Sequence, residues 1–173
     1  MGLVIAVATI ASYGAIWWIL GIRLAGQGSV PTDAVAVVIL ALLVATAWRR
    51  MPDESPERRR ERARRGNIIG IVTGIQGVLI LLTLRALHLV GRTDILAPVI
   101  AIIVGLHFLA FARLFPARVY YLTSALLVAL GVAGSFMGAG SVRLLTVSIG
   151  AACILWLTCS AVLIWPESRR SGP

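Results

Sequence analysis

The chain has 173 residues, of which 59% are hydrophobic and 13% charged, and its formal net charge is +9. Soluble domains are about 45–50% apolar and about 25% charged, so this composition excludes an ordinary soluble domain. All 16 basic residues are arginines. The absence of lysine excludes Schiff-base enzymes, a rhodopsin-type retinal linkage and a P-loop, each of which needs one. Two cysteines are too few for a disulfide-stapled scaffold.

Six apolar runs approach or exceed the roughly 20 residues that a membrane-spanning helix needs. They cover Leu3–Ile22, Thr32–Trp48, Asn67–Val90, Ile95–Phe115, Val119–Gly138 and Val142–Trp165. We therefore expect an all-α, integral-membrane six-helix bundle that forms one transmembrane domain over residues 1–173. A five-span chain is the alternative, because the glycines between Gly131 and Gly140 leave the end of the fifth run open. Proline soon after each even-numbered run also suggests three helical hairpins, although unrelated helices stop at proline as well.

The first run is predicted to be retained as a helix, because no lysine or arginine precedes Arg23 as in a cleavable signal peptide. Loop arginines predict the orientation. If the segment between the second and third runs is cytoplasmic, 12 arginines lie inside and 4 outside. Cytoplasmic loops carry such an excess. Both termini, including a tail over residues 166–173, are then expected in the cytoplasm.

The Arg-rich segment at residues 49–66 is the longest polar stretch. It is predicted to form a short helix that starts at Pro56 and ends at Gly66 and Asn67. The alternative is that this helix runs straight into the third span. Its net charge of +4, from eight arginines and four acids, should attract anionic lipid headgroups. The charge is otherwise explained by topology alone, and no nucleic-acid partner is expected. The candidate headgroup-binding residues are Arg58, Arg59, Arg60, Arg62, Arg64 and Arg65.

Few polar side chains fall inside the apolar runs. Counted from the cytoplasmic ends, Gln76 lies about 13 Å and His107 about 12 Å deep, so we expect a hydrogen bond between them on adjacent helices. Thr73 and Thr158 are candidates to join this pair. One interpretation is a substrate-binding site in a cavity open to the cytoplasm, and the other is an interhelical polar clasp.

A second polar cluster is expected near the outer ends of the helices. It comprises Arg85, His88, Arg92 and Asp94, with Asp33 as a further acid. It is interpreted either as an anion-binding or pH-sensing mouth, or as an interface anchor with a salt bridge. The two histidines differ in depth by about 14 Å, so no metal site, haem or other cofactor is expected.

Two glycine patterns predict close helix contacts. The third run carries Gly70, Gly74 and Gly77, and the fifth carries Gly131, Gly134 and Gly138. These faces are expected either to pack within the bundle or to form a homodimer.

The residues from Gly105-Leu106-His107-Phe108 to Phe115, followed by Tyr120-Tyr121-Leu122-Thr123, carry a resemblance to a family of proteins. The chain is similar here to uncharacterised small bacterial multi-pass membrane proteins, which share a GLHF-x-x-x-A-x-x-F helix end and a following Y-x-x-T-G. The family has Gly where this chain has Ser124. The resemblance implies a bacterial inner-membrane protein and supplies no substrate.

These observations lead to two functional hypotheses. The first is a non-enzymatic scaffold, stress-related or accessory protein of the inner membrane, because the runs contain no catalytic set. The alternative is a small permease or channel-like translocator that uses Gln76 and His107. An enzyme acting on lipid is the weakest option, because His107 would be a general base without an orienting carboxylate.

Overall fold

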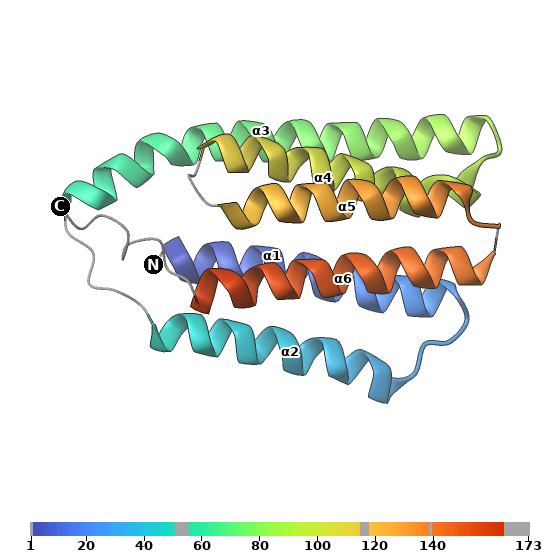
Figure 1. Ribbon diagram of the computed structural model, residues 1–173, viewed down its shortest axis with the longest axis horizontal. Helices are drawn as coiled ribbons and strands as arrows, with labels where there is room; N and C mark the ends of the chain where they lie inside the picture. The colour runs from blue at the N-terminus through green and yellow to red at the C-terminus, as the bar shows by residue number, and fades with distance from the viewer. Residues whose placement is uncertain (1, 51–55, 115–117, 139, 165–173) are drawn as a thin grey trace.

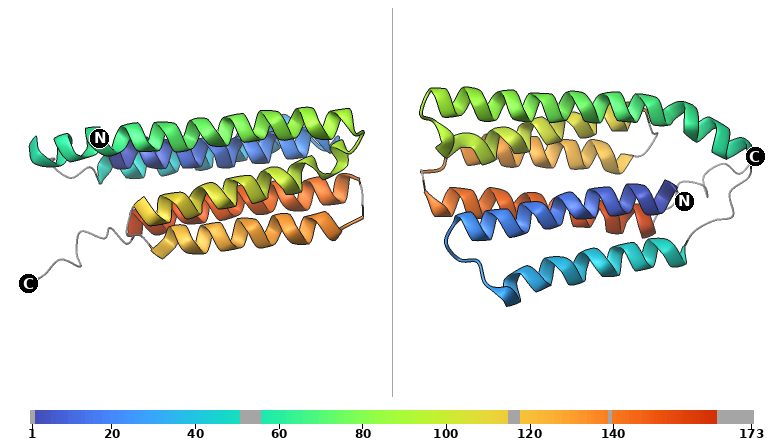
Figure 2. Two further views of the ribbon diagram at one scale, coloured as in Figure 1. Left: turned by 90° about the horizontal axis from the view of Figure 1, so that it is seen from above. Right: turned by 180° about the vertical axis from the view of Figure 1, so that it is seen from behind.

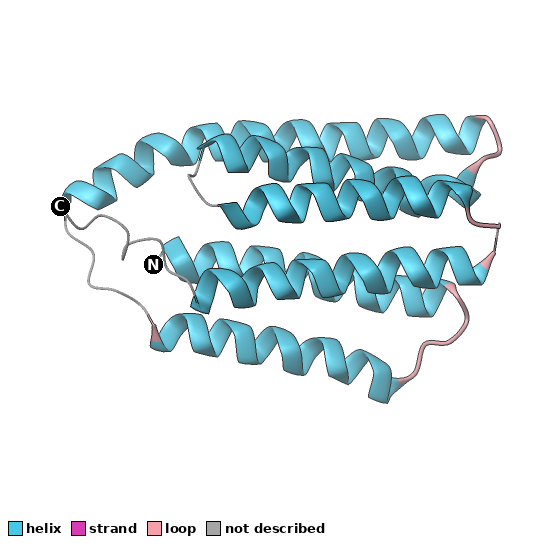
Figure 3. Ribbon diagram, in the orientation of Figure 1, coloured by secondary structure: helices cyan, strands magenta, loops and turns pink. Residues whose placement is uncertain are grey.

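The computed structural model describes residues 2–50, 56–114, 118–138 and 140–164, with the backbone alone described for 56–69. The helices of this part of the chain are α1 (Gly2–Leu24), α2 (Val30–Arg49), α3 (Pro56–Leu89), α4 (Leu96–Leu114), α5 (Arg118–Phe136) and α6 (Ser141–Ile164), with a 3₁₀ turn η1 at Thr93–Ile95. All six α-helices contain a segment long and apolar enough to cross a membrane, and no strand occurs in the described ranges (Figure 3). The prediction of an all-α six-helix bundle is confirmed.

The helices run back and forth along one axis, so α1 begins and α6 ends at the same end of the bundle (Figure 1). Helix α6 lies at the centre, in contact with α1, α2, α4 and α5. The most extensive contacts join α4 to α5 and α1 to α6, and thus do not join consecutive helices of the predicted hairpins α1–α2, α3–α4 and α5–α6. Helices α2 and α3 are peripheral: 11% and 6% of their most apolar windows are buried, against 50% in α6.

The connections at the opposite end are short and contain a glycine in the left-handed region. Gly26, Gly91 and Gly140 have φ values of 76°, 67° and 123°, which glycine adopts without a steric cost. Helix α2 follows a capping box in which Ser29 and Thr32 each accept a hydrogen bond from the backbone N–H of the other. Because Gly140 lies in the turn before α6, the glycine-rich region ends the fifth span without removing it.

Helix α3 has no break at Gly66 and Asn67, so the predicted helix end there is wrong and the alternative continuous helix is found. A helix end of the expected kind needs a glycine with positive φ, which Gly66 does not have. A helical glycine costs only about 1 kcal/mol relative to alanine, too little to stop the helix. At 1.5 Å per residue, the 34 residues of α3 span about 51 Å, whereas a bilayer's hydrocarbon core is about 30 Å thick. Accordingly α3 extends beyond the other helices (Figure 2).

The core has two parts that meet at α6. In the first, Trp156 of α6 packs against the small residues of α1 and donates its indole N–H to the Ala11 carbonyl at 3.2 Å. A Cβ atom at Gly14 would lie 2.6 Å from that indole nitrogen, so the glycine makes room for the ring. In the second, Phe108 of α4 packs with Leu127 of α5 and Leu155 of α6. Small residues on α1 and large ones on α6 thus set the spacing of the helices.

Candidate functional site

The predicted polar pair lies on the adjacent helices α3 and α4. Gln76 is the buried side chain of the described α3 residues 70–89, with 7% of its surface exposed. His107 of α4 is half-buried. Its imidazole lies near the backbone of Val72 in α3, and the edge of the ring meets Phe111, with a centroid separation of 4.6 Å. The histidine therefore reaches α3, as expected, but at its backbone.

The expected Gln76–His107 hydrogen bond is not formed among the described residues. Val72 and Gln76 are four residues apart and share a face of α3, so the histidine meets this face one turn away from the glutamine. The depth of Gln76 was counted from a helix end at Asn67, and α3 has no end there. The register of α3 on α4 is instead fixed by the turn at Gly91 and by side-chain packing.

The two threonines of the predicted site separate. Thr73 is half-buried on α3. Thr158 is buried on α6, and its Oγ1 lies 2.7 Å from that of Thr123 on α5. Each hydroxyl is also within hydrogen-bonding distance of the carbonyl four residues earlier in its own helix, Val119 for one and Ile154 for the other. This is an interhelical clasp of a kind that typically contributes about 0.6 kcal/mol.

The outer cluster has a different centre from the predicted one. Asp94 accepts a hydrogen bond from Arg143 Nη1 at 2.8 Å, and its contact with Arg92 is longer, at 3.4 Å. Arg85 and His88 are exposed on α3, and neither is paired with Asp94 in the described structure. The prediction that these two residues join the cluster is therefore wrong, because the N-terminus of α6 brings Arg143 to the α3–α4 turn.

Arg143 is buried and connects two turns at the same end of the bundle. Its Nη1 also donates to the Asp94 carbonyl at 3.1 Å, and its Nε donates to the Met137 carbonyl at 3.0 Å. The acid that was considered as a further member of the outer cluster, Asp33, is paired with Arg23 between α1 and α2. The sequence placed Arg143 only on the outer side, and its two carbonyl partners come from turns that no pattern predicts.

The two glycine faces have opposite surroundings. A Cβ atom at Gly131 would lie 2.6 Å from the Pro98 carbonyl oxygen of α4, and one at Gly134 would lie 2.5 Å from Val147 of α6. Intramolecular packing therefore uses this part of the α5 face. A Cβ atom at Gly70, Gly74 or Gly77 of α3, or at Gly138 beyond α5, would meet nothing within 4 Å. These small residues are open in the described structure.

The remaining predicted groups provide no assembled site in the described structure. No three His, Cys, Asp or Glu side chains of that part lie together as a metal site would require. Cys153 is exposed and Cys159 is buried, and both are free. The side chains proposed to bind headgroups lie outside the described residues, although their backbone belongs to α3; they are Arg58, Arg59, Arg60, Arg62, Arg64 and Arg65.

Comparisons with known proteins give a family and no function. No curated protein matches the chain, and no solved structure does. Residues 63–165, which include the spanning part of α3 and all of α4, α5 and α6, match a family of unknown function (DUF7010). The match covers more than half of the 173 residues and agrees with the expectation of an uncharacterised family. The chain is therefore a multi-pass membrane protein that belongs to this family of unknown function.

Proposed function

We propose that the protein is a non-enzymatic scaffold or accessory protein of the bacterial inner membrane, with both termini in the cytoplasm. The observation that carries this proposal is the way the polar groups of the spans are used. The Thr123 and Thr158 hydroxyls face each other, the Trp156 indole bonds a carbonyl of α1, and the Ser135 hydroxyl bonds the Gly131 carbonyl of its own helix. Polar groups at membrane depth are expensive, and here they hold the bundle together.

The orientation is proposed from charge. With six spans, the ends of α2 and α4 and the start of α5 share one end of the bundle, and Arg49, Arg50, Arg113 and Arg118 lie there. The opposite end holds Arg23, Arg92 and Arg143. The positive-inside rule assigns the end with more arginines to the cytoplasm.

The scaffold is proposed to associate through α3, as a homodimer. This helix is peripheral, and its glycines Gly70, Gly74 and Gly77 leave open space where a second helix backbone can approach. The corresponding glycines of α5 are supported differently, since Gly131 and Gly134 already pack against other helices of the same chain.

A translocator is the second candidate, and one observation favours it. Gln76 is buried at membrane depth, one turn from the point where His107 meets α3. A buried amide without a hydrogen bond to the nearby imidazole is a group that a polar solute could use.

One set of proteoliposomes tests both candidates. Wild-type protein labelled with donor and acceptor fluorophores is reconstituted with a trapped pH-sensitive dye and with carboxyfluorescein. A scaffold is expected to give energy transfer that Gly74→Leu reduces, and to leak no faster than protein-free vesicles. Ala133→Leu, at an exposed position of α5, is the matched control and should leave energy transfer unchanged. Flux well above protein-free vesicles would contradict the scaffold, and its loss in His107→Ala would support the translocator.

A further inference from the structure

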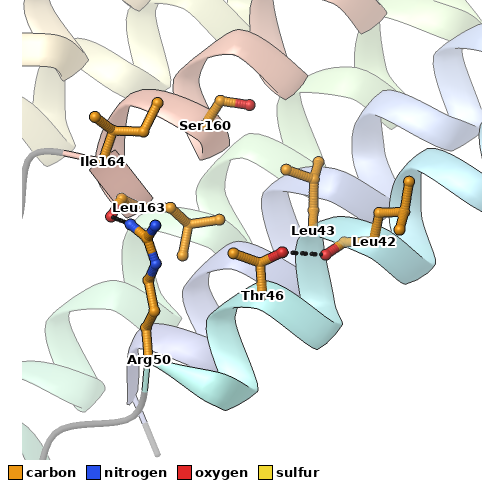
Figure 4. A pocket seen from close by; sticks show the side chains of 7 residues that line it. All are labelled: Leu42, Leu43, Thr46, Arg50, Ser160, Leu163 and Ile164. Atoms are coloured by element: carbon orange, nitrogen blue, oxygen red, sulfur yellow. Dashed lines mark hydrogen bonds between the residues drawn. The ribbon is translucent and has the colours of Figure 1, made fainter.

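A crevice at the arginine-rich end of the bundle separates the peripheral helix α2 from α6 (Figure 4). It has a volume of about 200 Å³. Leu42 and Leu43 of α2 form one wall, and Leu163 and Ile164 of α6 form the other. The guanidinium of Arg50 reaches across its mouth and donates a hydrogen bond from Nη1 to the Leu163 carbonyl at 2.6 Å.

The polarity of the crevice changes in order along α2. Leu42, Thr46 and Arg50 follow each other at four-residue intervals, so they lie along one stripe about 12 Å long. The cation is at the end of the helix, the hydroxyl is midway and the leucine is deepest. A phospholipid has the same order, with a phosphate, then ester groups, then an acyl chain.

The hydroxyl groups of the crevice are already engaged within their own helices. Thr46 donates to the Leu42 carbonyl at 2.7 Å, and Ser160 donates to the Trp156 carbonyl at 3.0 Å. Arg50 is different, because a guanidinium has five N–H donors and the bond to Leu163 uses one of them. Arginine is suited to bind a phosphate through two parallel N–H bonds.

The size and exposure of the crevice point to part of an elongated ligand. Pockets that enclose a whole small molecule have volumes of about 300–1,000 Å³, which is larger than this crevice. Leu42 and Ile164 are each 62% exposed, so the walls continue onto the surface that faces the bilayer. An acyl chain can enter such a crevice sideways from the membrane.

We propose that this crevice binds one acyl chain of an anionic phospholipid from the adjacent leaflet, with Arg50 bound to its phosphate. The charge favours an anionic over a zwitterionic lipid, because Arg50 is next to Arg49 and none of the lining residues is acidic. This site is separate from the Arg-rich part of α3 and does not depend on the scaffold function.

Native mass spectrometry of the full chain in detergent tests the proposal, with phosphatidylglycerol and phosphatidylcholine of equal chain length at equal concentration. We expect about tenfold greater retention of phosphatidylglycerol and a ratio near one in Arg50→Gln. Such a change corresponds to about 1.4 kcal/mol, roughly one charge-assisted hydrogen bond. Thr46→Phe, which fills the crevice, should lower the retention of both lipids.

Arg49→Gln is the matched control, since Arg49 is exposed beside Arg50 but does not line the crevice. An equal loss of preference in both arginine variants, or none in Arg50→Gln, would overturn the proposal. Unchanged lipid retention in Thr46→Phe would do so too, and this variant decides the matter if thermal melting shows that Arg50→Gln is unfolded. Displacement of the lipid by soluble glycerol phosphate would show that the headgroup alone is recognised and would refute the role of the acyl chain.

Discussion

Replacement of Gly131 by alanine tests the close contact between α5 and α4. The new Cβ atom would lie 2.6 Å from the Pro98 carbonyl oxygen and 3.0 Å from the Ile102 backbone nitrogen. Ordinary contact begins at 3.4 Å, so the first separation must grow by 0.8 Å. Both neighbouring atoms belong to the backbone of α4, and no side-chain rotation can relieve the clash. The two helices must move apart along the most extensive helix contact of the bundle.

Overpacking of this kind costs about 1–3 kcal/mol. The higher helix propensity of alanine offsets about 1 kcal/mol of that. The matched control is Gly74→Ala on α3, where the Cβ atom would meet nothing within 4 Å and only the propensity gain applies. We therefore expect the free energy of unfolding to be about 2–3 kcal/mol lower in Gly131→Ala than in Gly74→Ala. Titration with sodium dodecyl sulfate in mixed micelles, followed by far-UV circular dichroism, measures this difference. Equal stability of the two variants would refute the proposed close approach.

Two further predictions concern the outer end of the bundle and the orientation. Asp94→Asn removes the carboxylate that faces the buried Arg143, and should lower the free energy of unfolding by about 1.5–3 kcal/mol in the same titration. Arg92→Gln should change it by less than about 1 kcal/mol because the Arg92 side chain is 61% exposed, and a larger effect would contradict this assignment. In intact cells, an impermeant thiol reagent should label Gln27→Cys in the α1–α2 connection but not Arg60→Cys in α3. The reverse pattern would overturn the orientation.

The number of spans could be predicted because the signal is local. A helix crosses the hydrocarbon core when about 20 consecutive residues are apolar, and this property can be counted in each run separately. The start of α3 at Pro56 is also local, because proline is favoured in the first turn of a helix. The end expected at Gly66 failed for a related reason, since a glycine permits a helix end but does not require one.

The polar contacts could be predicted only in part. Depth counted along each helix placed His107 beside α3, but the rotation and register that direct it to Val72 depend on how α3 and α4 pack. Thr158 was a candidate for that site, yet α6 turns it toward Thr123 of α5. A sequence lists the polar groups at each depth, whereas the order of helices around the bundle decides which of them meet.

The sequence by itself determined six apolar spans, the absence of lysine-dependent chemistry and the uneven distribution of the arginines, because each follows from composition along one stretch of chain. Only the tertiary structure decided the fate of the two glycine patterns. Gly131 packs against the backbone of α4, whereas Gly74 is open at the periphery. The same small-residue spacing allows close approach in both cases, but a contact also needs a neighbour, and the neighbours are set by the packing of the whole bundle around α6.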